Sequence, residues 1–523
     1  MKPIDPMRRV SDNRCVSEIA LSGSVEAVSA FRRSALIKAL RHSKGVWARS
    51  VRTRFETRDQ DLAARGFTIE IEETPNGRAQ VISRTNAFNG ILGQNEVTTQ
   101  LDDDTPFPAP SGVFEFDQPV AQMGSTLGPR AKTTTEKWSV ALTYRGALID
   151  AAFHFTTRER WDAQGLRQTT PIAFVRLVDP KGRGGAVLDF ARVAVKEAGL
   201  FPDLRALENS EESFDEPQEI SRALKVRVSP DDLAHETLGQ TIDIVANRLI
   251  ELRPAVLERR DPRGLQQLRV ALRRLRVIER LYRPYLTDPT LLGLAKRARR
   301  LTRLFGVARD WDVFLTTILP DAAEGAYPPA GFQGLRRRAE AERAEAWDDV
   351  INAVLSRGFG RLSIDLLDAG RTRPWLKGAD PALRAPVLGF AQTVLDDALA
   401  NALFVGADID RQSLIGRHPL RIALKRVRYA AQTFRALFPK EHRKPYMAEL
   451  SRFQEALGQI NDVATAHLLA DHAAKGGGDD VIRAAGFLYG VQAPQAILAA
   501  EAVDNAWAAF KTKTPFWRLV QEI

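Results

Sequence analysis

The chain contains one helical phrase twice. Residues 266–277 read QQLRVALRRLRV and residues 418–429 read HPLRIALKRVRY, so Arg269 and Arg421 are 421 − 269 = 152 positions apart. The same offset joins further identical pairs that follow the phrases: Arg300 and Arg452, Gly306 and Gly458, Asp310 and Asp462. An offset kept over about 45 residues indicates an internal duplication. It predicts two similar helical bundles related by a pseudo-twofold axis, with the two phrases at one surface.

Each phrase forms a helix with one apolar stripe and one cationic row. Side chains three, four and seven positions apart share a face of an α-helix. The apolar stripes are Leu268, Leu272 and Leu275 in the first phrase, and Leu420, Leu424 and Val427 in the second. The rows beside them are Gln266, Arg269, Arg273, Arg276 and Arg280 in the first phrase, and His418, Arg421, Lys425 and Arg428 in the second.

The cationic rows predict an anionic partner. A solvated, salt-bridged face is the structural alternative, but residues 262–278 and 411–429 contain no Asp or Glu. Like charges one helical turn apart repel each other by a few tenths of a kcal/mol. Each turn of about 5.4 Å presents another cation, which suits a chain of phosphates. His418 is either a capping or packing residue or a phosphate donor, whereas Gln266 can donate but cannot titrate.

Composition places the basic character in the second half. Residues 1–225 hold 31 Lys and Arg and 30 Asp and Glu, whereas residues 226–523 hold 75 − 31 = 44 and 65 − 30 = 35, a net charge of +9. Such a half suits nucleic acid, anionic lipid or another phosphate polymer. The single Cys15 excludes an intramolecular disulfide. Without an apolar leader or an apolar run of about 18 residues, we expect a cytoplasmic protein and no membrane partner.

The first half predicts an α+β domain with a mainly antiparallel sheet, after a loose arm at residues 1–15. Short alternating runs separated by turn residues indicate strands. Helical periodicity is limited to two segments. The expected strands are 16–21, 46–55, 67–72, 79–84, 95–101, 138–144, 147–156 and 171–178, and the expected helices are 25–41 and 185–199. Residues 203–224 are acidic and polar and predict a linker.

The second half predicts helices throughout. Gly306 and Gly458 are expected to end helices, and Asp310 and Asp462 to cap the helices that follow. These carboxylates are also candidates to anchor the arginines of the cationic rows. The expected helices are 230–260, 263–284, 289–305, 310–319, 332–356, 359–369, 381–404, 417–437, 441–457, 461–474, 479–499 and 501–511.

Residues 225–515 resemble a CHAD domain. The resemblance rests on the phrases LRVALRRLR, HPLRIALKRVRY, FGVARDWDV and FQEALGQIND. It implies two four-helix bundles, here about 225–370 and 380–515, that bind inorganic polyphosphate through basic residues. The residues implicated by position are Arg269, Arg273, Arg276, Arg280, His418, Arg421, Lys425 and Arg428, with Arg300, Arg303 and Arg452 as further candidates. Gln266 departs from the family, which has histidine there, so a role that needs both histidines is not implied.

Residues 16–202 resemble a CYTH domain in outline. That family forms an antiparallel β-tunnel or barrel whose acidic residues hold divalent metal and whose basic residues hold a triphosphate. The segment from Arg54 to Gly66 fits its pattern, but the Glu-x-Glu-x-Lys strand reads Glu18-Ile-Ala-Leu-Ser, and Glu70-Ile-Glu72 stands where Arg-x-Arg is usual. These departures predict that the metal and triphosphate site of the family is degenerate in this chain. The surviving candidates are Glu18, Arg84, Glu96 and Lys137.

Three functions follow as hypotheses. The first is non-catalytic binding of inorganic polyphosphate, with no catalytic residue, no metal and no cofactor, and with targeting to polyphosphate granules as a corollary. The second is a metal-dependent triphosphatase or polyphosphatase, which would bring Mg²⁺ or Mn²⁺ to an active CYTH-like tunnel. The third is nucleic-acid binding, which is disfavoured because Tyr429 is the one aromatic residue in the cationic rows. Oligomeric state and chain-length preference are not encoded in these patterns.

Overall fold

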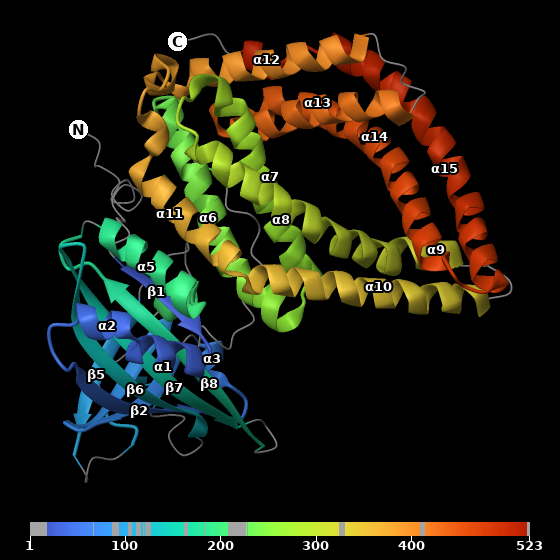
Figure 1. Cartoon of the computed structure of the whole chain (residues 1–523). Coiled ribbons are helices and arrows are strands. Elements are labelled where there is room, and N and C mark those ends of the chain that lie inside the picture. The colour runs from blue at the N-terminus through green and yellow to red at the C-terminus, as the bar shows by residue number, and fades with distance from the viewer. Residues whose placement is uncertain are drawn as a thin grey trace. The chain divides into compact units, whose positions relative to one another are not determined.

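The chain divides into two compact units, Met1–Asp215 and Glu216–Ile523. The computed structural model describes residues 18–519 except 66, 86–93, 103–106, 111–116, 119, 121–126, 162–165, 183, 208–225, 227, 324–329 and 408–413. The predicted arm of residues 1–15 and most of the predicted linker therefore lie outside the described residues. We call the two units the sheet unit and the helical unit, and treat each by itself (Figure 1).

The sheet unit is built on one antiparallel sheet of nine strands. Its hydrogen-bonding order is β5-β4-β3-β2-β6-β7-β8-β1-β9, and every pairing is antiparallel, as the alternation predicted. The strands are β1 (Glu18–Gly23), β2 (Val46–Glu56), β3 (Phe67–Thr74), β4 (Gly77–Thr85), β5 (Gln94–Leu101), β6 (Gly128–Tyr144), β7 (Ala147–Trp161), β8 (Arg167–Val178) and β9 (Phe201–Pro202).

The two faces of this sheet differ because successive side chains of a strand point to opposite sides. One face is apolar and is covered by α1 (Val25–Arg33), α2 (Ala35–Leu40) and α5 (Gly185–Ala198) (Figure 1). Phe31 of α1 lies there with its ring centroid 6.2 Å from Phe153 of β7 and 6.0 Å from Phe190 of α5. The opposite face carries charged side chains, among them those of Arg52, Glu70 and Glu72.

The linker predicted from residue 203 begins too early. Residues Leu204–Leu207 form a 3-10 helix, η3, that contacts β1 and β8. The side chains of Asp203 and Arg205 are buried and joined by an ion pair of 2.9 Å, and Ala206 belongs to an apolar cluster with Phe174. The polar residues of this segment suggested that it is exposed to solvent. Asp203 and Arg205 can nevertheless be buried because they form an ion pair with each other.

The described part of the helical unit is helical, as predicted, but its first half contains six α-helices where four were expected. The first bundle contains α6 (Ala234–Arg259), α7 (Pro262–Tyr282), α8 (Thr290–Val313), α9 (Leu319–Ala323), α10 (Ala330–Leu355) and α11 (Arg357–Thr372). The second contains α12 (Val387–Ala407), α13 (Leu414–Thr433), α14 (Lys440–Ala474) and α15 (Asp479–Thr512). Helices α14 and α15 run side by side, and α10 packs against α15 (Figure 1). One apolar core runs through both bundles.

Three predicted helix breaks are wrong. Gly306 lies inside α8, Gly458 lies inside α14, and α15 continues through the break expected at residue 500. Asp310 and Asp462 are therefore mid-helix residues and not N-caps. Tertiary packing on long buried stripes outweighs the cost of about 1 kcal/mol that glycine imposes on a helix. None of the described helices is long and apolar enough to cross a membrane.

Candidate anion-binding site

A cavity of about 540 Å³ lies between α7 and α13, and we call it the central cavity. Six of its lining side chains are cationic, and one lining residue, Glu455, is acidic. The basic lining residues are Arg273, Arg274, Arg421, Lys425, Arg428 and Arg435, and the others are Val270, Val277, Tyr429, Gln432, Thr433, Gln454, Glu455 and Gly458.

The apolar stripes of the two phrases determine which side chains reach this cavity. Leu268, Leu272 and Leu275 of α7 are fully buried, as are Leu420, Leu424 and Val427 of α13. Burying a leucine or valine contributes about 1.5–3 kcal/mol, which fixes the rotation of each helix about its axis. The neighbouring rows are thereby turned toward one another, and Arg273, Arg421, Lys425 and Arg428 meet in the cavity.

Two contacts across the helices position individual cations. The guanidinium of Arg273 lies over the ring of Tyr429, 5.4 Å from its centroid. Gln454 of α14 accepts a hydrogen bond of 2.8 Å from Arg428 and donates one of 2.8 Å to the carbonyl of Leu424. Tyr429 is thus engaged by an arginine, and Arg428 is held by a neutral amide that leaves its charge uncompensated.

Burial and the neighbouring positive charges lower the pKa of Lys425. Burial, followed by the neighbouring Arg421 and Arg273, lowers this pKa to about 8. Burial lowers the pKa of Arg421 as well, against the effect of Asp462. No ion pair joins Arg273, Lys425 or Arg428 to any residue in the described part of the chain. The cavity is an electropositive site whose charges would be stabilised by an anion.

The two mid-helix carboxylates lie at the arginines, as the sequence predicted. Asp310 is 3.9 Å from the guanidinium of Arg269, and Asp462 acts on both Arg421 and Lys425. Burial raises the pKa of Asp310; Arg269 opposes this shift, and the negative charge of Asp462, which is close enough to act on Asp310, adds to it. Repeat-equivalent residues thus meet at one place, which is what a pseudo-twofold axis requires.

The other predicted site residues are distributed around this cavity. Arg269 is half-buried beside Asp310, and the pKa of Arg276 is lowered by burial and then by Arg280 and Arg299. Arg280 and His418 line a second cavity. The remaining three, which do not line the central cavity, are exposed: Arg300 and Arg303 on α8, and Arg452 on α14, where Arg452 pairs with Glu449 at 3.2 Å.

Two arginines of the central cavity were missed by the sequence reasoning. Arg274 lies one position outside the cationic row of α7, and Arg435 belongs to the 3-10 turn after α13. Burial and then Arg435 lower the pKa of Arg274. The repeat offered a signal for Arg274, because its equivalent, at 274 + 152 = 426, is also arginine.

Two arginines on the charged face of the sheet unit, in contrast, are paired with acids. Arg52 lies 3.1 Å from Glu72 and 3.9 Å from Glu70, and Glu18 pairs with Arg176. Lys137 is exposed on β6, and the side chains of Arg84 and Glu96 lie outside the described residues. Throughout the part of the chain that is described, no group of three or more His, Cys, Asp or Glu side chains could hold a metal ion.

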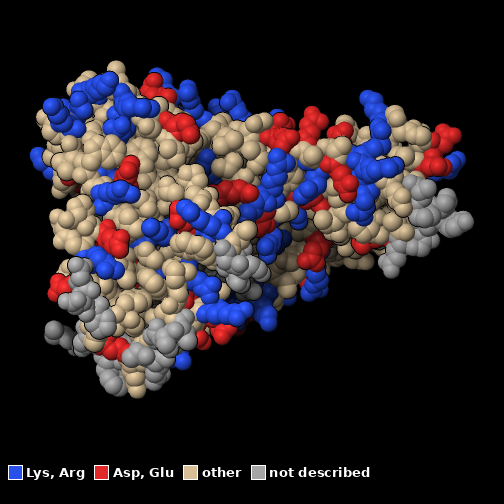
Figure 2. Space-filling view, turned by 90° about the horizontal axis from the view of Figure 1, so that it is seen from below, with Lys and Arg blue, Asp and Glu red and all other residues tan. Residues whose placement is uncertain are grey.

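On the one face that Figure 2 shows, surface charge does not single out a site. On the face shown in Figure 2, Lys and Arg side chains are interspersed with those of Asp and Glu. Mixed surfaces of this kind are ordinary for soluble domains. The central cavity differs because six cations line it together with one acid.

Comparison with known proteins finds a match within the helical unit. A family model described as "CHAD domain" matches residues 241–471, and the chain carries a CHAD domain there. The crystal structure of the CHAD domain from the plant Ricinus communis is 25% identical, with a TM-score of 0.49, covering 57% of this chain and 98% of that one. No curated protein sequence matches this chain.

Two further solved structures are similar to the sheet unit. A candidate adenylate cyclase from Bacillus halodurans is 13% identical with a TM-score of 0.23, covering 35% of this chain and 90% of that one. A candidate adenylyl cyclase from Hippeastrum, described as having a dominant triphosphatase activity, is 14% identical with a TM-score of 0.24, covering 38% and 94%.

Proposed function

We propose that the helical unit binds inorganic polyphosphate in the central cavity without catalysing a reaction on it. The observation that carries the proposal is the meeting of Arg273, Arg421, Lys425 and Arg428 in one cavity, with the pKa of Lys425 lowered to about 8 by burial and its cationic neighbours. Such crowding is unfavourable in the unliganded protein. A polyanion relieves it, since each phosphate group brings negative charge between the opposing rows.

The rows favour a phosphate polymer over nucleic acid. Binding of single-stranded nucleic acid depends on aromatic platforms for the bases, each worth about 1–3 kcal/mol. The aromatic ring in the central cavity is that of Tyr429, which is covered by Arg273. Polyphosphate needs no such platform. In competition, polyphosphate should displace DNA or RNA at a far lower phosphate concentration than the reverse.

A charge-reversal variant tests the proposal. Replacement of four cations by glutamate should abolish polyphosphate binding by the full chain in a calorimetric titration, and circular dichroism should retain the helical signal. These four are Arg273, Arg276, Lys425 and Arg428. The matched control reverses four exposed cations of the same unit, Arg336, Arg337, Arg357 and Lys440, and should bind nearly as the wild type does. Unchanged polyphosphate affinity in the first variant would refute the proposal.

The proposal also bears on where the protein acts. Binding of this kind would recruit the chain to deposits of polyphosphate, and we expect it to follow such granules in the cell. Microscopy of the labelled wild type and of the four-glutamate variant would test this, because only the wild type should co-localise with stained polyphosphate.

A further inference from the structure

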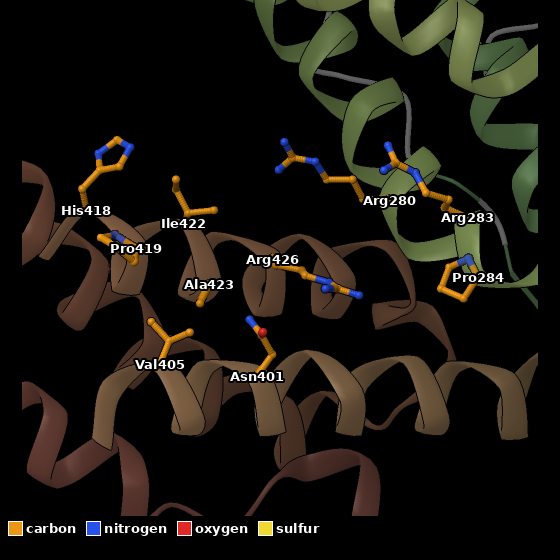
Figure 3. A pocket seen from close by; sticks show the side chains of 10 residues that line it. All are labelled: Arg280, Arg283, Pro284, Asn401, Val405, His418, Pro419, Ile422, Ala423 and Arg426. Atoms are coloured by element: carbon orange, nitrogen blue, oxygen red, sulfur yellow. The ribbon is translucent and has the colours of Figure 1, made fainter. Parts of the chain in front are cut away.

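A second cavity of about 660 Å³ is lined by a different set of α13 residues, and we call it the lateral cavity (Figure 3). Its walls come from α12, from α13, and from the end of α7 with the 3-10 turn Arg283–Tyr285. The lining residues are Arg280, Arg283, Pro284, Asn401, Val405, His418, Pro419, Ile422, Ala423 and Arg426.

The duplication relates this cavity to one flank of the central cavity. Subtracting 152 from Ile422 and Arg426 gives Val270 and Arg274, and adding 152 to Arg280 and Arg283 gives Gln432 and Arg435. These four equivalents all line the central cavity. The lateral cavity is therefore a repeat-related site that has diverged, since Arg280 replaces a glutamine and His418 stands where the first repeat has Gln266.

The lateral cavity is cationic and partly uncompensated. None of its lining residues is acidic. Arg283 is paired with Glu279, but the Nε of Arg426 is buried and has no hydrogen-bond partner. A buried donor without an acceptor costs about 1–3 kcal/mol. An anionic ligand would lie within the same cavity as Arg280, Arg283 and Arg426, and a shift of the Arg426 side chain would let its buried Nε donate to that ligand.

Several of the other lining residues are apolar. Pro284, Val405, Pro419 and Ile422 line the cavity, and Ile422 is 47% exposed. Ile422 and Ala423 lie between His418 and Arg426 along α13 (Figure 3), and all four residues line the lateral cavity. A bare phosphate chain has no part that would cover these apolar groups, whereas an organic anion has one.

We propose that the lateral cavity binds an organic phosphate of the nucleoside polyphosphate class. Its phosphoryl groups contact Arg280, Arg283 and Arg426, because guanidinium groups match phosphate oxygens in charge and shape. Its base lies on Ile422 and the prolines, and the carboxamide of Asn401 offers a donor and an acceptor to the base edge. The volume falls in the usual range of about 300–1,000 Å³ for small-molecule sites.

The test compares two ligands that share their phosphates. ATP and tripolyphosphate are titrated calorimetrically into the full chain without added metal. Ile422→Ser removes apolar contact from an exposed position, and should weaken ATP about 10-fold while leaving tripolyphosphate unchanged. Arg426→Gln should weaken ATP about 10-fold through the lost charge-assisted contact. Thermal melting checks that both variants are folded.

The repeat supplies a matched control. Val270→Ser is the equivalent change in the central cavity, and the pair Arg421→Gln with Lys425→Gln removes charge there. Both should leave ATP affinity unchanged. Three results would overturn the proposal: no heat of ATP binding up to millimolar ligand, equal affinity for ATP in wild type and Ile422→Ser, or loss of ATP binding in the central-cavity variants.

Discussion

The sheet face and the central cavity both collect arginines, but they balance them differently. In the sheet unit Arg52 is flanked by Glu70 and Glu72 from the neighbouring strand. In the central cavity Arg273 and Lys425 face further cations, and the pKa of Lys425 falls to about 8. Neutralised pairs at a partly exposed surface contribute little beyond about 1 kcal/mol. Uncompensated cations instead store repulsion that an anion releases, so residue counts alone do not reveal where a polyanion binds.

Separation of the two units should have the largest effect. When the chain is divided near residue 215, where the units part, the helical half should bind polyphosphate and the sheet half should not. Calorimetric titration of each half measures this. The sheet half should also release no phosphate from tripolyphosphate with Mg²⁺ or Mn²⁺. If the sheet half releases phosphate and Glu18→Gln abolishes this activity, the sheet unit is an enzyme. That result would contradict the comparison of the sheet face with the central cavity.

Salt should weaken binding to the helical unit strongly. Each neutralised phosphate releases counterion, with a logarithmic slope of about −0.7 per contact on a single-stranded polyanion. For four contacts, a rise from about 50 to about 200 mM salt lowers affinity about 50-fold. Titrations at several salt concentrations give the slope. In the variant Arg428→Gln the slope should become shallower by about one contact, and an unchanged slope would exclude Arg428 from the interface.

Lys425 should make binding depend on pH. Its amine is charged below a pKa of about 8 and neutral above it. Polyphosphate favours the charged amine, so binding takes up protons near this pH. Affinity should therefore fall about 10-fold as the pH rises above the pKa, because about one charge-assisted contact is lost. Titrations in buffers of different ionisation heat measure the proton uptake. Lys425→Arg keeps the charge and should remove the dependence, and an equally strong dependence in that variant would assign it elsewhere.

Loss of acids from the sheet face should have the smallest effect. Glu70→Gln with Glu72→Gln leaves Arg52 without the carboxylates that now pair with it. We expect the sheet half to gain weak binding of tripolyphosphate that the unchanged sheet half lacks, measured by calorimetry. Glu73→Gln is the matched control, because this residue pairs with Arg78 on the other side of the strand. No gain in the double variant would show that the face lacks a phosphate site for reasons other than charge balance.

Much of the fold was accessible from the sequence, because periodicity and the repeat are local signals. The alternating runs predicted the antiparallel sheet, and the apolar stripe of α7 and α13 predicted which sides are buried. The helix breaks at Gly306 and Gly458 were wrong, since local propensity does not register the packing that carries α8 and α14 through them. The sequence placed Arg280 and His418 in the same helical rows as the residues of the central cavity, although they line the lateral cavity.

By itself, the sequence determined the duplication, the helical character of the second half and the two cationic rows, because each is written in spacings along one segment. Only the tertiary structure decided which cations meet. The crossing of α7 and α13 brings Arg273 beside Lys425 and places Tyr429 under a guanidinium, and the packing of α14 adds Gln454 to Arg428. These neighbours are about 26 to 156 positions apart in the chain. Their proximity depends on how whole helices pack, since a pKa or an unpaired donor is set by what surrounds a side chain.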